Sequence, residues 1–329
     1  MGFGDKCKNV KGVDVALKWN VLFTAMGSIG SRHLKNLSNI FEKNGDTLCV
    51  DVIRKTSRQL PEDIKCLVNR EIYNINDIES YYDVIFITGI TSEHFDEILF
   101  YKNHTKYLFI EKPIFESLNY PLEKIMPGDE DLYYVATPMR YTPVYKRLQE
   151  IVAEKTIFAA RIICSSYMPD WQKGRDYRKS FRTKNDQGGG VDIDLIHEID
   201  YMIGLFGMPE EVNRMAGKYS DLEMEACDIA NYLFRYQNML AEVHLDYFGR
   251  KDQRYIELYT ADDVIVGDYM EKKIKYLASG KEEIFDKSID HYYLEMDSFV
   301  KMIKEKNEAL NINTVMNAID VLKWTKGEC

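Results

Sequence analysis

The stretch that decides the fold is NVLFTAMGSIGSRHLKNL, residues 20–37. Residues 20–25 are mostly apolar and predict a strand, whereas the apolar residues after Gly30 recur at helical spacing. Between them, Ala25, Gly27 and Gly30 occupy the three positions of G-x-G-x-x-G, with alanine in the first. Small residues there allow a tight turn, close approach of the backbone to a pyrophosphate and close packing of helix on strand. This order predicts a dinucleotide-binding site; the alternative is a purely structural glycine turn.

Short apolar runs and helical patterns alternate after this stretch. The strand candidates are residues 47–53, 82–90, 107–110 and 132–136, and the helix candidates are residues 93–103 and 144–153. Continuous apolar strands alternating with helices are typical of a parallel sheet covered on both faces. We therefore expect an α/β domain with a doubly wound parallel sheet over residues 1–145.

The pattern changes beyond about residue 156. A long apolar run and closely spaced strand candidates follow, with one helix candidate between them and two at the end: strands at residues 157–167, 229–236, 239–248, 255–260 and 264–269, and helices at residues 191–206, 291–305 and 314–324. Hairpin-length links such as Gln237-Asn238 favour antiparallel pairing. We expect residues 146–329 to form an α+β domain with a large, mainly antiparallel or mixed open sheet. Its C-terminal helices are free to pack back on the first domain.

Composition is that of a packed globular protein, since 45% of the 329 residues are hydrophobic and 29% are charged. The 43 Lys and Arg against 53 Asp and Glu give a net charge of -10, which argues against nucleic acid as a partner. No apolar run reaches the roughly 18 residues of a membrane-spanning helix. The cysteines show no C-x-x-C pair and are predicted to be reduced thiols: Cys7, Cys49, Cys66, Cys164, Cys227 and Cys329. We expect a cytoplasmic protein with no membrane or metal site.

The residues after the second strand candidate bear on which dinucleotide binds. An acid about 20 residues beyond the turn usually binds the adenosine ribose, and Asp51 has that spacing. Apolar residues continue beyond Asp51, however, so Arg54 is the better candidate for the residue at the end of the strand. Arginine near this position accommodates a 2′-phosphate, and Ser57 and Arg58 follow, which favours NADP over NAD. The alternative is that this basic run is only a solvated loop.

Two further segments complete a wider pattern with the turn and helix at residues 26–37. One is T-S-x-H at residues 91–94 together with E-K-P at residues 111–113; the other is G-G-G-x-x-x-D-x-x-H-x-x-D at residues 188–200. At this spacing the segments together resemble the Gfo/Idh/MocA family of oxidoreductases, of the glucose–fructose oxidoreductase and inositol dehydrogenase type. The resemblance covers nearly the whole chain from about residue 20.

The resemblance implies a Rossmann domain and a larger α/β domain whose open sheet often mediates dimer or tetramer contacts, with NAD(P) across the cleft. Lys112 matches the E-K-P lysine of the family, which positions the substrate and interacts near the nicotinamide. His197 matches the catalytic histidine and Asp194 its neighbouring acid. Many members space this acid and histidine four residues apart rather than three, so His197 is carried over more firmly than Asp194.

The chemistry of alcohol oxidation points to the same histidine. The cofactor takes the hydride, and the protein must supply a base that works near neutral pH, for which histidine is suited. His197 follows a triple glycine, with Asp194 and Asp200 three residues to either side. We predict Lys112, Asp194 and His197 as the catalytic residues. On the residues alone, His197 also fits an ordinary packed histidine.

The predicted cofactor contacts run from the turn to the ends of the strands that follow it. His94 belongs here because open α/β sheets bind ligands where strands lead into helices. The set is Ala25, Gly27, Ser28, Ile29, Gly30, Arg54, Ser57, Arg58, Thr88, His94, Glu111 and Lys112.

A basic, aromatic segment precedes the triple glycine. Residues 169–184, PDWQKGRDYRKSFRTK, carry six Lys and Arg, Lys173 among them, against two Asp, a charge of +4 in a chain of -10. Aromatic planes suit stacking on a sugar or base, and guanidinium groups suit phosphate or carboxylate. We hypothesise that this loop covers the cleft and selects an anionic sugar; the alternatives are an exposed loop or a subunit contact. The predicted substrate-binding residues are Arg140, Trp171, Arg175, Tyr177, Arg178, Asp194 and His197. For Arg140, a salt bridge between domains fits equally well.

We therefore expect an NAD(P)-dependent dehydrogenase or reductase of a sugar, cyclitol or nucleotide sugar, acting as a homodimer or homotetramer. One alternative is a glycoside-cleaving enzyme that uses a tightly held NAD for transient oxidation. Another is a non-catalytic regulator on the same fold that senses dinucleotide or sugar. Retention of Lys112, Asp194 and His197 together disfavours the regulator.

Overall fold

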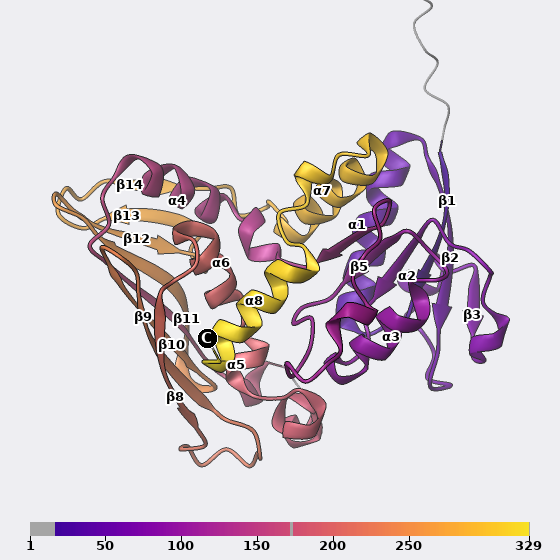
Figure 1. The fold of residues 1–329 in the computed structure, drawn as a ribbon, viewed down its shortest axis with the longest axis horizontal. Helices are drawn as coiled ribbons and strands as arrows, with labels where there is room; N and C mark the ends of the chain where they lie inside the picture. The colour runs from indigo at the N-terminus through magenta and orange to yellow at the C-terminus, as the bar shows by residue number, and fades with distance from the viewer. Residues whose placement is uncertain (1–16, 172–173, 329) are drawn as a thin grey trace, which may run out of the picture.

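The computed structural model describes residues 17–171 and 174–328, which form two sheets with helices packed around and between them (Figure 1). Cys7, Lys173 and Cys329 lie outside these ranges. The helices are α1 (Ser28–Asn44), α2 (Glu62–Lys65), α3 (His94–Tyr101), α4 (Pro143–Glu154), α5 (Val191–Asp194), α6 (His197–Phe206), α7 (His291–Glu305) and α8 (Val315–Lys326). In these ranges, no helix is both long enough and apolar enough to cross a membrane.

The first sheet is parallel throughout and confirms the predicted doubly wound architecture. Its strands, in spatial order, are β3 (Arg70–Ile72), β2 (Thr47–Ile53), β1 (Lys18–Phe23), β4 (Val84–Ile87), β5 (Tyr107–Ile110) and β6 (Leu132–Val135). Strand order reverses between β1 and β4, and ligands bind at such a switch point in open α/β sheets. The turn after β1 therefore lies where a dinucleotide is expected.

Burial explains why the sequence predicted most of these strands as apolar runs. Every residue of β4 and β6 is buried, as a strand covered on both faces requires. Phe299 of α7 contributes to one cover, with its ring 5.1 Å from that of Phe109 on β5. Since α7 also packs against α1, the C-terminal region returns to the first sheet, as Figure 1 shows. The edge strand β3 has only three residues, two of them charged, and the sequence did not predict it.

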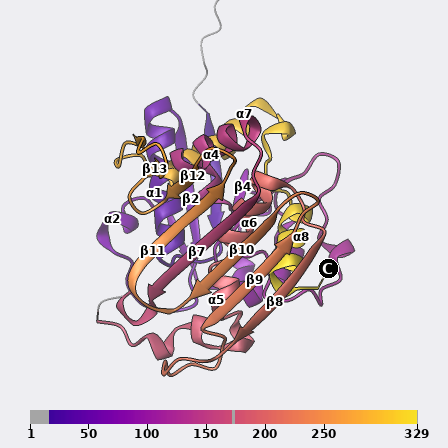
Figure 2. The ribbon, with the colours of Figure 1, turned by 90° about the vertical axis from the view of Figure 1, so that its left-hand side faces the viewer.

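The second sheet is mixed, as predicted. Its strands, in spatial order, are β14 (Glu282–Ile284), β13 (Lys273–Tyr276), β12 (Val264–Asp268), β11 (Phe248–Tyr259), β7 (Ala159–Tyr167), β10 (Leu240–Asp246), β9 (Ile229–Arg235) and β8 (Glu211–Gly217). Only the β7–β10 pair among these is parallel. Figure 2 looks onto the open face of this sheet. The edge strands β8 and β14, and β13 beside β14, were missed because they are short or carry polar residues on their exposed face.

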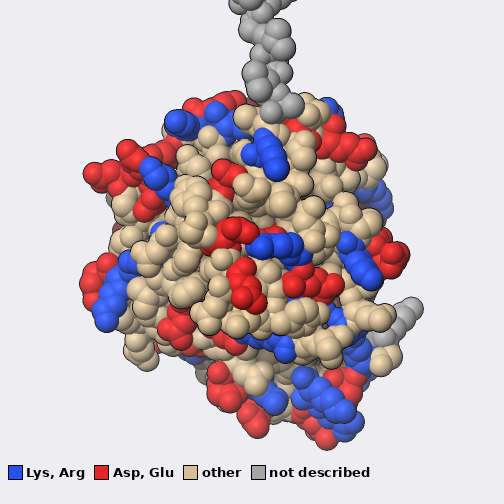
Figure 3. All heavy atoms as spheres, turned by 90° about the vertical axis from the view of Figure 1, so that its right-hand side faces the viewer, with Lys and Arg blue, Asp and Glu red and all other residues tan. Residues whose placement is uncertain are grey.

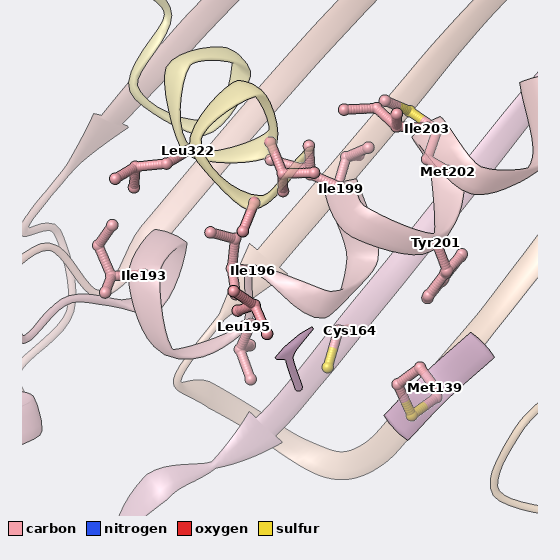
Figure 4. Close-up of a cluster of buried hydrophobic side chains, with 14 of the residues drawn as sticks. Met139, Cys164, Ile193, Leu195, Ile196, Ile199, Tyr201, Met202, Ile203 and Leu322 are labelled. Carbon is pink, nitrogen blue, oxygen red and sulfur yellow. The ribbon is translucent and has the colours of Figure 1, made fainter. Parts of the chain in front are cut away.

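The single helix predicted over residues 191–206 is wrong, because the chain forms two helices that meet at Leu195 and Ile196. Lys112 Nζ donates a hydrogen bond to the Asp194 carbonyl oxygen (2.7 Å), and the Glu198 amide bonds instead to the Leu195 carbonyl. A continuous helix would pair Glu198 with Asp194. Figure 4 shows the apolar side chains of this region between Leu322 of α8 and Cys164 of β7. The lysine contact comes from a distant strand, so helical periodicity could not reveal the break.

Candidate active site

The turn after β1 has the shape that a bound pyrophosphate requires. A Cβ on Gly30 would lie 2.6 Å from the Ala25 carbonyl oxygen, so glycine is needed there for packing of α1 on β1. A Cβ on Gly27 would meet no atom of the described chain within 4 Å, so this residue faces open space. Ser28 and Ile29 begin α1, whose amide groups can meet a phosphate charge. The predicted turn residues therefore form a cradle that fits a dinucleotide.

The end of β4 closes this cradle on the other side. Thr88 Oγ1 donates to the Ala25 carbonyl oxygen (2.7 Å), which joins the switch-point strands. Glu111, at the end of β5, is buried and forms a short contact with His33 of α1. Burial alone would raise the pKa of Glu111, but His33 and Lys112 hold it below its ordinary value.

His94 occupies a buried position behind the E-K-P segment. Its Nδ1 lies 3.1 Å from the Pro113 carbonyl oxygen and 3.2 Å from that of Ile114, so Nδ1 carries the hydrogen. Burial lowers the pKa of this imidazole. His94 therefore supports the segment that carries Lys112, and its predicted contact with the cofactor stays a prediction.

The basic residues at the end of β2 are only partly available to a ligand. The buried Arg54 donates from Nη2 to the Arg58 carbonyl oxygen, and its Nε lies 3.4 Å from Glu71 Oε2. Ser57 and Arg58 are exposed. Asp51 is buried and accepts hydrogen bonds from Arg70 (Nε, 3.0 Å) and the Tyr82 hydroxyl (2.7 Å). The carboxylate at the spacing of a ribose acid is thus already occupied.

A cavity of about 300 Å³ adjoins the carboxyl end of β5. It is lined by Lys112, Cys164, Ser165, Ser166, Trp171, Arg182, Asp194, Leu195, His197, Asp252, Gln253, Arg254 and Met270. These residues come from the segment after β5, from β7 and β11 of the second sheet, from α5 and α6, and from the basic loop. The structure therefore brings together the three residues predicted to be catalytic and one of the predicted aromatic residues of the loop.

Asp194 is the centre of the polar contacts in this cavity. Arg182 Nε donates to Asp194 Oδ2 (2.7 Å), and the buried Tyr247 hydroxyl lies 3.2 Å from the same oxygen. Lys112 Nζ lies 3.9 Å from Asp194 Oδ1 in addition to its bond with the backbone carbonyl. Burial alone would raise the pKa of Asp194, but Arg182 and Lys112 hold it below its ordinary value. Asp194 is therefore ionised at neutral pH and orients both cations.

His197 and Lys112 are both tuned toward their neutral forms. Burial, followed by the positive charges of Lys112 and Arg254, lowers the pKa of the His197 imidazole well below its ordinary value. Burial also lowers the pKa of Lys112, although Asp194 opposes that shift. A histidine that is neutral at pH 7 is able to accept a proton from a hydroxyl group.

Arg182 and Arg254 are cavity residues that the sequence did not single out. Arg182 belongs to the basic segment, and its position close to the triple glycine is the feature of the sequence that could have assigned it to the site. Arg254 lies on β11 just after a register shift between Phe248 and Gln253, with its Nε 2.8 Å from Oε1 of the fully buried Glu198. Such a shift re-aims neighbouring side chains. Nothing in the sequence of β11 marks it.

The rest of the predicted substrate set divides into two groups. Trp171 lines the cavity, and its Nε1 donates to Ser166 Oγ (3.0 Å). Arg175, Tyr177 and Arg178 do not line the cavity; Arg178 is exposed and pairs with Asp176 (2.8 Å) and Glu223 (3.2 Å).

Arg140 is also outside the cavity lining. Its side chain is buried, with Nη2 2.8 Å from Asp200 Oδ1 and Nε 3.0 Å from Asp200 Oδ2. This two-bond pair links η4 (Pro138–Tyr141) to α6, so Arg140 acts in the structure as a bridge between segments.

The surface charge shows no basic face on the side of the first sheet. Figure 3 shows Lys and Arg interspersed with Asp and Glu over that side of the molecule. Among residues 17–171 and 174–328, no group of three or more His, Cys, Asp or Glu could hold a metal ion.

Comparison with known families bears directly on the second sheet. Residues 145–265 match the model of the GFO/IDH/MocA C-terminal domain. This part of the chain is a Gfo/Idh/MocA C-terminal domain. The match confirms the resemblance drawn from the sequence motifs. Among curated proteins, none matches the chain in sequence.

Solved structures share the fold over almost the whole chain. Levoglucosan dehydrogenase in complex with NADH has a TM-score of 0.78 at 14% identity, covering 94% of this chain and 95% of its own. UDP-N-acetylglucosamine 3-dehydrogenase GnnA from Acidithiobacillus ferrooxidans has a TM-score of 0.75 at 16% identity, covering 94% and 96%. The WlbA dehydrogenase from Bordetella pertussis, in complex with NADH and UDP-GlcNAcA, has a TM-score of 0.74 at 12% identity, covering 94% and 95%.

Proposed function

We propose that this protein is an NAD(P)-dependent oxidoreductase that transfers a hydride between nicotinamide and a hydroxyl or keto carbon of a sugar, cyclitol or nucleotide sugar. The observation that carries the proposal is the convergence of Lys112, Asp194 and His197 in one cavity at the carboxyl end of β5, in the sheet whose switch point carries the glycine turn. Similar folds that bind NADH and sugars or nucleotide sugars support it.

The chain's own residues supply the proton chemistry. When bound, the dinucleotide accepts or provides the hydride. His197, neutral because of burial and its cationic neighbours, accepts the hydroxyl proton during oxidation. Lys112 donates a hydrogen bond to the reacting oxygen and stabilises the negative charge that develops there. Asp194 holds Lys112 and Arg182 in place through the contacts described above.

We further propose that the substrate carries a negative charge. Lys112, Arg182 and Arg254 bring three cations to the cavity lining, against Asp194 and Asp252; Glu198, which lies 2.8 Å from Arg254, is fully buried and does not line the cavity. Trp171 presents an aromatic ring at the same cavity, which suits stacking on a sugar. Arg182 bonds to Asp194 and also lines the cavity, so the same guanidinium group can contact both a negatively charged substrate and a catalytic residue.

The preferred dinucleotide is a separate part of the proposal. The arginine at the end of β2 favours NADP on sequence grounds, whereas in the structure the Arg54 side chain lies beside the Glu71 carboxylate. Both dinucleotides therefore belong in the binding experiment. The boundary between the two domains at residues 145 and 146 stays a prediction, and so does the cytoplasmic location.

We also propose a homodimer or homotetramer formed through the open face of the second sheet (Figure 2). Three large apolar side chains on neighbouring strands are exposed there: Met215 (76%), Leu233 (41%) and Leu240 (46%). Light scattering coupled to size-exclusion chromatography measures the molar mass in solution and hence the number of subunits. Replacing Leu233 by Lys should shift the mass to that of a monomer.

A thermal-shift screen tests the main proposal. NAD(H) and NADP(H) are each combined with a panel of neutral and anionic sugars and nucleotide sugars, because a ligand of the native state raises the melting temperature. We expect one dinucleotide pair to raise it, and an anionic sugar to raise it further. Substrates that emerge are then assayed by the change in nicotinamide absorbance. No shift with either dinucleotide would overturn the proposal.

A further inference from the structure

Glu97 is a partly buried carboxyl group that the proposed mechanism does not use. It projects from α3 toward the ends of β1 and β4. Thr24 Oγ1 donates a hydrogen bond to Glu97 Oε2 (2.8 Å), and the Thr88 amide donates to Thr24 Oγ1 (3.2 Å). A Cβ on Gly89 would lie only 3.1 Å from Glu97 Oε1 and 3.2 Å from Glu97 Oε2. The carboxyl group therefore lies at the switch point, beside the turn that fits a pyrophosphate.

Few charges compensate this carboxyl group. Thr24 is a neutral donor, and no ion pair among the described residues includes Glu97. The charged and titratable groups that face it are Lys55 from the β2 loop, Glu93 from η2 (Thr91–Glu93) and Tyr101 from α3. Lys55 is paired with Glu93, and both are solvent-accessible. Burial raises the pKa of Glu97 to about 7, against the lowering effects of Thr24 and Lys55.

We propose that a dinucleotide binding to this turn takes up one proton at Glu97. The proposal rests on the dinucleotide site of the proposed function. A pyrophosphate in the cradle adds negative charge next to a partly buried carboxylate, where repulsion is stronger than in bulk water. Protonation removes that repulsion and turns the carboxyl group into a hydrogen-bond donor. The proton comes from the buffer and returns to it when the dinucleotide leaves.

The direction of the pH effect follows from linkage. The free protein has Glu97 partly protonated near pH 7, and the negative ligand favours the protonated form further. Above pH 7 the free protein must therefore gain a proton to bind. We expect the Kd of the dinucleotide to rise by up to about tenfold per pH unit above pH 7, and uptake to approach one proton near pH 8.

Isothermal titration calorimetry measures this directly. NADH and NADPH are each titrated into the full chain at pH 8, in HEPES and in Tris, which differ in ionisation enthalpy and contain no phosphate that would compete for the turn. Proton uptake makes the observed binding enthalpy depend on the buffer, and the slope gives the number of protons. Glu97→Gln, a neutral group of the same shape, should bind with no buffer dependence and with a Kd that does not change between pH 6.5 and 8.5. Asp96→Asn, an exposed carboxyl on the same helix, should keep the uptake.

The outcomes separate the two proposals. Tight binding of a dinucleotide without proton uptake by the wild-type chain would overturn the role of Glu97 and leave the proposed function standing. Uptake that persists in Glu97→Gln would also overturn the role of Glu97. Absence of any dinucleotide binding would overturn both proposals. Because the wild-type measurement alone can reject the inference, it does not depend on the variant folding.

Discussion

The two parts of the proposed site are held together in different ways. The dinucleotide cradle is one continuous stretch, in which Gly30 packs against the Ala25 carbonyl and backbone shape does the positioning. The substrate cavity draws Lys112, Arg182 and Asp194 from distant parts of the chain and positions them through charged contacts. A substitution in the cradle should therefore act through shape, and one in the cavity through charge and protonation. The predictions below test this difference, starting with the largest effect.

The strongest test of the cavity is His197→Ala. Loss of a general base at a positioned site typically costs 10²–10⁴ in rate, so kcat/KM should fall by about 10³. The affinity for the dinucleotide should change less than twofold, because His197 does not belong to the cradle. Stopped-flow or steady-state absorbance gives the first quantity and calorimetry the second. A variant that keeps a tenth or more of the wild-type kcat/KM would remove His197 from the proposed mechanism.

The difference between local shape and long-range contacts also explains which features could be predicted from the sequence. The glycine turn and the buried strands β4 and β6 depend on neighbouring residues, so motif spacing and apolar runs predicted them. Lys112 and His197 were found because they lie in motifs. The break between α5 and α6 and the place of Arg254 depend on contacts across the fold, which no local pattern contains.

The cradle offers a matched pair of glycine substitutions. In Gly30→Ala the new Cβ would lie 2.6 Å from the Ala25 carbonyl oxygen, so α1 must shift. We expect a loss of about 1–3 kcal/mol in the free energy of unfolding, and at least tenfold weaker dinucleotide binding.

Gly27→Ala is the control that separates packing from ligand contact. Its Cβ meets no atom of the described chain within 4 Å, so denaturant unfolding should stay close to that of the wild type. Dinucleotide binding should still weaken by about tenfold or more, because the methyl group occupies the space that a pyrophosphate needs. Equal losses of stability in the two variants would contradict the assignment of Gly27 to the ligand side.

In the basic loop, Arg182 and Arg178 should behave differently. Arg182 lies in the cavity and bonds to Asp194, so Arg182→Gln should raise the KM of an anionic substrate by about tenfold or more. Arg178 is exposed and paired with Asp176 and Glu223, so Arg178→Gln should change KM less than twofold. Steady-state kinetics with one anionic and one neutral sugar measures both. If Arg182→Gln raised the KM of the neutral sugar as much as that of the anionic sugar, Arg182 would act only by orienting Asp194.

The smallest expected effect is a shift in the acid limb of kcat/KM for the sugar, measured at saturating dinucleotide so that Glu97 does not contribute. Only neutral His197 accepts the hydroxyl proton, and its pKa lies well below its ordinary value. The rate should therefore stay level as the pH falls through 6.5, where an unperturbed histidine would lose half of its activity. Lys112→Gln removes one of the positive charges that lower this pKa. It should reduce kcat and also move the acid limb to higher pH, toward that of an ordinary histidine. An acid limb that stays in place would mean that burial alone sets the protonation of His197, and that the charges in the cavity position the substrate without tuning the base.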